Sequence, residues 1–104
     1  MPEFIFAYHG GTIPETQEEG AKAMAAWGAW FEAMGENVVN GGNPVGRSMT
    51  VTAHGVAEDG GANPISGYTI VRAETAEAAC EMAKGCPMVS DGSGSVEVAP
   101  VIVM

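Results

Sequence analysis

The chain has 104 residues, enough for one hydrophobic core and too few for two, and its composition predicts one folded domain over residues 1–104. Thirteen acidic residues against four basic ones give a net charge of −9, which repels phosphate groups and disfavours nucleic acid and membrane surfaces as partners. The apolar run at the N-terminus is too short for a signal peptide or a membrane span, so we expect a cytoplasmic protein.

The first predicted element is a strand from Glu3 to His9. Its side chains alternate between two faces, with Phe4, Phe6 and Tyr8 on one and Ile5, Ala7 and His9 on the other. Both faces are largely apolar, and helices of the same chain can cover only one of them. We therefore expect a second copy of the chain to cover the other, which predicts a homodimer.

A helix is predicted next, from a capping box at Thr16 and Glu19 to a stop at Gly35. Its apolar stripe consists of Met24, Trp27, Phe31 and Met34, widened by Trp30. Two tryptophans one turn apart either line an aromatic pocket or anchor the core, and the spacing favours the core.

The segment 40–46 is rich in Asn, Gly and Pro, which indicates a connection dense in turns. Residues 47–56 then alternate and predict a second strand, with one polar face that includes His54. A polar loop at 58–64 joins this strand to the next one as a hairpin.

The last third of the chain predicts a strand around Tyr68 to Val71, a helix from about Ala76 to about Lys84 capped by Thr75, and a final strand around residues 96–102. Pro100 cannot donate a hydrogen bond to a neighbouring strand, so the final strand should lie at an edge.

The predicted order is βαββαβ, the split βαβ arrangement of a ferredoxin-like α+β fold. We expect a four-stranded antiparallel sheet with two helices on one face and the first strand in a central position. Two such sheets packed face to face would form a dimeric α+β barrel.

Several segments together resemble the YCII-related, or DGPF-domain, family. They are the opening Phe-Ile-Phe-Ala-Tyr-His-Gly-Gly, the helix with both tryptophans, Gly-Gly-Asn-Pro-Val from residue 41, Ser-Gly-Tyr-Thr-Ile-Val-Arg-Ala-Glu-Thr from residue 66, Ala-Lys-Gly-Cys-Pro from residue 83 and Gly-Ser-Val-Glu-Val from residue 94.

The resemblance implies the dimeric α+β barrel with a cavity between the sheets. It also implies, in one branch of the family, an acid/base pair made of a histidine near the first helix and an aspartate in an Asp-Pro-Tyr turn. This chain has Lys22 as the nearest polar residue in its first helix, Cys86-Pro87-Met88 at the turn, and Asp59-Gly-Gly-Ala in place of Asp-Gly-Pro-Phe. That pair is therefore not carried over to this chain.

The candidate catalytic residues are His9 and His54, which can act as general acid and base near neutral pH or supply two nitrogen ligands to a metal. The alternative is that each is a hydrogen-bonded surface or interface histidine. Arg72 would bind a carboxylate, either a substrate's or that of Glu97, or else form a surface ion pair. Cys80 and Cys86 do not have the spacing of a redox motif or a zinc site, and we expect both to be reduced. A disulfide between them is the alternative.

The leading functional prediction is a homodimer with a mostly apolar cavity that binds a small organic molecule, with possible acid/base chemistry of the lyase or isomerase type. The expected lining residues are Tyr8, His9, Trp27, Trp30, His54 and Arg72. The alternative is a non-catalytic interaction module, which the resemblance links to extracytoplasmic-function sigma factors. Haem- or metal-dependent oxygen chemistry is the weakest alternative, and we expect no metal or cofactor.

Overall fold

The computed structural model describes residues 1–104 and is built around one antiparallel sheet with the strand order β2-β5-β1-β6. The strands of this sheet are β1 (Glu3–Gly10), β2 (Val38–Pro44), β5 (Ile65–Arg72) and β6 (Gly94–Pro100). A separate two-stranded hairpin consists of β3 (Thr50–Thr52) and β4 (Gly55–Ala57). Along the chain, β1, α1, β2, β5, α2 and β6 follow one another in the βαββαβ order of a ferredoxin-like fold.

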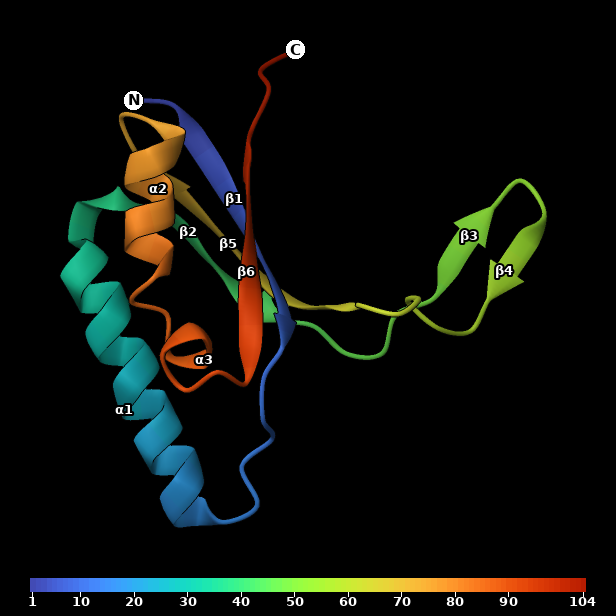
Figure 1. Cartoon of the computed structure of the whole chain (residues 1–104), viewed down its shortest axis with the longest axis horizontal. Coiled ribbons are helices and arrows are strands. Elements are labelled where there is room, and N and C mark those ends of the chain that lie inside the picture. The colour runs from blue at the N-terminus through green and yellow to red at the C-terminus, as the bar shows by residue number, and fades with distance from the viewer.

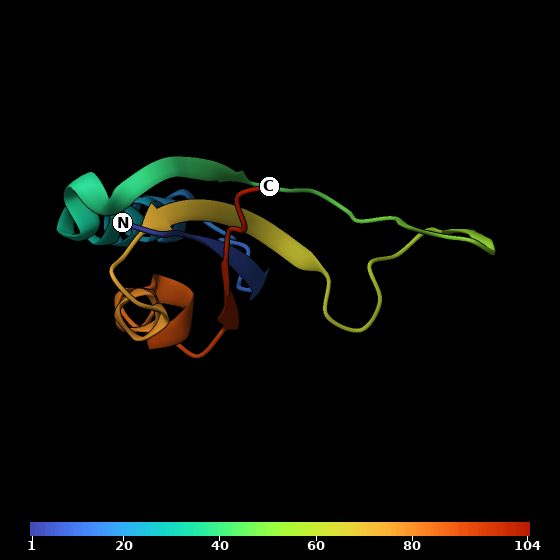
Figure 2. The same cartoon turned by 90° about the horizontal axis from the view of Figure 1, so that it is seen from above.

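The helices are α1 (Gln17–Met34), α2 (Ala76–Ala83) and the short α3 (Pro87–Ser90), with a 3₁₀ turn η1 (Gly35–Asn37) after α1. They lie together on one side of the main sheet, and no helix lies on the other (Figures 1 and 2). Thr16 and Thr75 cap α1 and α2 by accepting hydrogen bonds from the backbone N–H groups of Glu19 and Ala78. The ferredoxin-like α+β fold with helices on one face is thus confirmed.

Strand β1 occupies a central position, between β5 and β6, as the sequence predicts. Strand β6 lies at an edge, as Pro100 predicts, since a proline at an edge leaves no ladder hydrogen bond unmade. Both placements agree with the alternation and the proline seen in the sequence.

The prediction for the second strand was wrong. The second strand of the main sheet is β2, which includes part of the segment expected to be a connection. Residues 47–56, expected to form that strand, lie outside the main sheet. Strand β2 pairs with no strand other than β5, and its register shifts twice, between Val38 and Asn40 and between Asn40 and Asn43. An edge strand with bulges tolerates Gly, Asn and Pro, which the sequence pattern alone assigns to turns.

Gly42 explains why this irregular strand fits against β5. Its φ of +69° is disfavoured for residues with a side chain, and a Cβ at this position would lie 1.8 Å from the carbonyl oxygen of Tyr68. The absence of a side chain at residue 42 therefore permits the close approach of the two strands.

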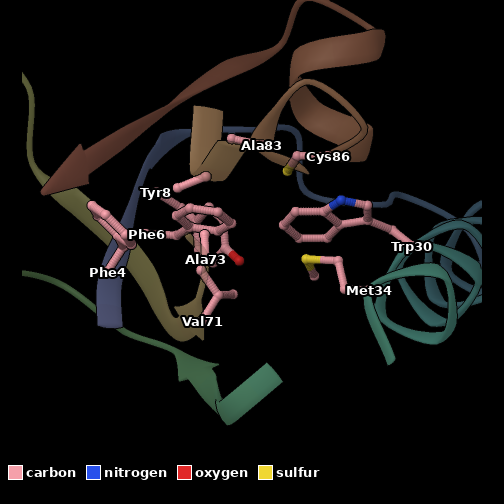
Figure 3. Packing of buried hydrophobic residues seen from close by; sticks show 10 residues of the cluster. Phe4, Phe6, Tyr8, Trp30, Met34, Val71, Ala73, Ala83 and Cys86 are labelled. Carbon is pink, nitrogen blue, oxygen red and sulfur yellow. The ribbon is translucent and has the colours of Figure 1, made fainter. Parts of the chain in front are cut away.

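The core lies between the helices and the sheet, as Figure 3 shows for its largest side chains. The buried hydrophobic residues are Phe4, Phe6, Tyr8, Trp30, Met34, Val71, Ala73, Ala79, Ala83 and Cys86. The predicted stripe of α1 was wrong at Met24, which is 78% exposed because the first half of α1 extends past the end of the sheet (Figure 1). The two cysteines are not joined, and Cys80 is exposed whereas Cys86 is buried.

Candidate functional site

The side of the main sheet without helices is called the open face here. Residues that are directly opposite each other in the sheet share a face, so the register defines its rows of side chains. One row consists of Ile5, Ile70 and Ala99; the next of Ala7, Tyr68 and Glu97; the last of His9 and Ser95. The open face is thus apolar at its centre and carries ionisable groups at both ends, with Glu3 and Arg72 where β1 begins and His9 and Glu97 where it finishes.

His9 lies at that end of β1, where the pairing with β5 contains a bulge between Tyr8 and His9. Its Nδ1 atom lies 3.0 Å from the carbonyl oxygen of Asn63 and 3.2 Å from that of Pro64. Its Nε2 atom lies 2.9 Å from Oε1 of Glu97, which is diagonal to it on the neighbouring strand β6. Both ring nitrogens therefore face oxygen acceptors.

Acceptors at both nitrogens favour the doubly protonated imidazolium, because a neutral ring has only one N–H to donate. The hydrogen bond to Glu97 is the main cause that raises the pKa of His9 above its ordinary value of 6.5, and the backbone carbonyls act in the same direction. The His9 side chain is only 11% exposed whereas that of Glu97 is 68% exposed. The pair thus combines an imidazole held at both ring nitrogens with a carboxylate that a ligand can reach.

Three of the predicted lining residues lie on the opposite side of the sheet from His9. Tyr8 and Trp30 are buried between the sheet and the helices, and the half-buried Trp27 packs edge-on against Tyr8 at 5.2 Å between ring centres. Trp30 donates its indole N–H to the carbonyl of Met82, 2.9 Å away. The positions of the two tryptophans match the interpretation that their spacing favoured, in which they anchor the core.

Tyr8 belongs to a buried chain of hydrogen bonds rather than to a cavity wall. Its hydroxyl donates to Oγ1 of Thr69 at 2.6 Å, and the Thr69 hydroxyl donates to the carbonyl of Gly41 at 3.0 Å. Burial raises the pKa of Tyr8 to about 12, against a smaller opposing effect of the bond with Thr69. This phenol is therefore a structural donor and no proton-transfer group near neutral pH.

The remaining two candidates do not meet His9 either. His54 lies in the turn of the β3–β4 hairpin, outside the main sheet and exposed. Arg72 is opposite Glu3 at the far end of the open face, where β1 begins. Glu97, which the sequence interpretation offered as a partner for arginine, pairs with His9 instead. The structure therefore separates the predicted residues, and it pairs His9 with Glu97, which was not among them.

The hollows of the single chain are shallow and open. One of them has a volume of about 210 Å³ and is lined by Arg47, Asp59, Pro64, Ile65 and neighbouring glycines and serine. It adjoins the histidine through Pro64, whose carbonyl faces Nδ1. A chamber that encloses a ligand over the open face needs a cover from outside this chain.

Other kinds of site find little support in the arrangement of side chains. No three residues of the metal-binding types come together, and no helix has the combination of length and apolarity that crossing a bilayer requires. Burial raises the pKa of the Cys86 thiol, which makes it a poor nucleophile.

The sheet order and the helices on one face define a ferredoxin-like α+β protein. A solved structure with this fold is 5-chloro-2-hydroxyhydroquinone dehydrochlorinase (TftG) from Burkholderia phenoliruptrix AC1100, in complex with 2,5-dihydroxybenzoquinone. The two chains share 16% sequence identity with a TM-score of 0.60, over 100% of this chain and 96% of the other. No protein-family model and no curated protein sequence matches the chain. At this identity the likeness establishes the fold alone.

Proposed function

We propose that this chain is a YCII-related protein that forms a homodimer, binds a small organic molecule over the open face and transfers protons to and from it through His9 and Glu97. The observation that carries the proposal is the position of His9, held by two backbone carbonyls on one side and facing an accessible carboxylate on the other. Such a pair can donate a proton from Nε2 and accept one at the carboxylate.

The substrate class follows from the chemistry of the face. The apolar side chains at its centre, such as Ile5 and Ile70, suit the apolar surface of a ring, and the His9–Glu97 pair at its end suits a hydroxyl or carbonyl oxygen on that ring. The dehydrochlorinase of the same fold was solved with 2,5-dihydroxybenzoquinone, a compound of this description. We therefore propose hydroxylated quinones and hydroquinones, and elimination or isomerisation reactions of the lyase or isomerase type.

A binding screen tests the ligand class. Thermal unfolding is measured with 2,5-dihydroxybenzoquinone and a series of substituted hydroquinones, and a ligand present at about 100 times its Kd should add about 2.7 kcal/mol of stability. Failure of the whole series to stabilise the protein would remove this substrate class.

The catalytic roles are tested on any compound that the protein converts. Loss of a general acid or base typically lowers a rate by about 10²- to 10⁴-fold, so His9→Gln and Glu97→Gln should both fall in that range. His54→Gln is the matched control, because its side chain lies on the exposed hairpin. Equal rates for His9→Gln and His54→Gln would exclude His9 as the proton donor.

A further inference from the structure

Residues 45–64, here called the arm, leave the main sheet between β2 and β5 and carry the β3–β4 hairpin at their end. The arm projects away from the body of the molecule, on the side opposite to the helices (Figures 1 and 2). The molecule measures 43 × 43 × 20 Å and has a radius of gyration of 14.8 Å, whereas a compact chain of this length has about 13 Å. The arm is thus an extension that makes few contacts with its own chain.

The hairpin has one apolar face that nothing covers. Val51 and Val56 are directly opposite each other, and Met49 lies just before the first strand of the hairpin. These three side chains are 74%, 59% and 62% exposed, in the order Val51, Val56 and Met49. An isolated two-stranded hairpin is at best marginally stable in water, and an exposed apolar face on one indicates a missing cover.

We infer that this apolar face of the arm docks on a second copy of the chain, the same copy that covers the open face. This inference rests on the homodimer of the proposed function. It adds that the apolar face of the arm is a surface that holds the two copies together. The first argument is position, since the arm extends on the side of the sheet that a second copy would occupy (Figure 1). A copy that covers the open face is therefore brought next to the arm.

The second argument is area. Four strands of eight residues or fewer, at about 3.3 Å per residue and about 4.8 Å between strands, give the open face about 500 Å² per copy. Two such faces bury about 1,000 Å², below the roughly 1,600 Å² that is typical of stable interfaces. The three apolar side chains of each arm supply further apolar surface, which the sheets alone do not provide.

The arm also contacts the candidate site at its base. The carbonyls of Asn63 and Pro64, the last arm residues before β5, face Nδ1 of His9. An arm that is docked on the partner holds these carbonyls in place, and an undocked arm leaves them on a free loop. Docking is therefore expected to fix the orientation of His9 as well as to secure the dimer.

The test compares two double variants by sedimentation. Val51→Asp with Val56→Asp places two charges on the apolar face, and Thr52→Asp with Ala57→Asp places two charges on the other face of the same hairpin. All four side chains are exposed in the single chain, so both variants should retain the thermal stability of the folded body. The first variant should raise the dimer Kd by at least about 100-fold, from the loss of two buried valines in each copy, and the second by less than about threefold.

The outcomes separate the inference from the proposed dimer. Equal dimer Kd values for the two variants and the unaltered chain would overturn arm docking and leave the dimer in place, whereas an unaltered chain that sediments as a monomer would remove both. A photo-reactive amino acid in place of Val51 in the purified protein gives a second readout. Crosslinks between two copies support the inference, and crosslinks only within one copy overturn it.

Discussion

The imidazole of His9 lies 2.9 Å from the carboxylate of Glu97, although 88 residues separate the two along the chain. The contact exists because the first and last strands are neighbours in the sheet and their side chains meet diagonally on the open face. It places an imidazole and a carboxylate at one end of a face whose centre is apolar. The register between β1 and β6 thus brings the two side chains of the candidate site together.

Glu97→Gln should lower the pKa of His9 toward 6.5, because it removes the carboxylate that is the main cause of the upward shift. In the unaltered protein the stabilisation from this pair is fully present below pH 6.5 and is lost as the pH rises through the raised pKa of the folded state. NMR titration in a His54→Gln background follows His9 alone. Identical titration midpoints with Glu97 and with Gln at this position would contradict the pairing.

Thr69→Val should destabilise the fold more than Tyr8→Phe. The valine leaves the buried Tyr8 hydroxyl without an acceptor and the Gly41 carbonyl without its donor, at about 2–3 kcal/mol, whereas the phenylalanine leaves Thr69 bonded to Gly41 and costs about 1 kcal/mol. Urea unfolding at neutral pH measures both values. An equal or greater loss for Tyr8→Phe would show that the hydrogen-bond chain does not run through Thr69.

Two glycine substitutions should change stability in opposite directions. Gly28 lies inside α1 with open space around it, so Gly28→Ala should stabilise the protein by about 1 kcal/mol and raise its Tm by about 4–8 °C. Gly42→Ala should destabilise it by about 2 kcal/mol or more, because its φ is positive and the new Cβ meets the Tyr68 carbonyl. Calorimetry of the two variants measures both effects. A neutral Gly42→Ala would contradict the described path of β2.

Local signals in the sequence were enough to predict most elements of the fold. The alternation from Phe4 to Tyr8 identifies the central strand because side chains repeat every two residues, and Thr16 and Thr75 mark helix starts because their hydroxyls accept free backbone N–H groups. Strand β2 was missed because its pairing depends on the close approach at Gly42, a tertiary contact that a local pattern of Gly, Asn and Pro does not reveal.

The candidate site was predicted only in part for the same reason. His9 stood out as an ionisable residue at the end of a strand, but its pairing with Glu97 depends on the register between β1 and β6. The apolar pattern also does not say which face of β1 meets the helices. For that reason Tyr8, Trp27 and Trp30 were grouped with His9, although the sheet separates them from it. Assigning the helices to the more aromatic face would have avoided this grouping.

Sedimentation equilibrium of the unaltered chain at micromolar concentration tests most directly whether a second copy of the chain covers the open face. A second copy on that face requires a mass of twice the 10.6 kDa of one chain. Ile70→Asp places a charge at the centre of the face and should return the mass to that of one chain. If the unaltered protein stays in solution as a single chain at these concentrations, the open face has no such cover and the shared ligand chamber does not exist.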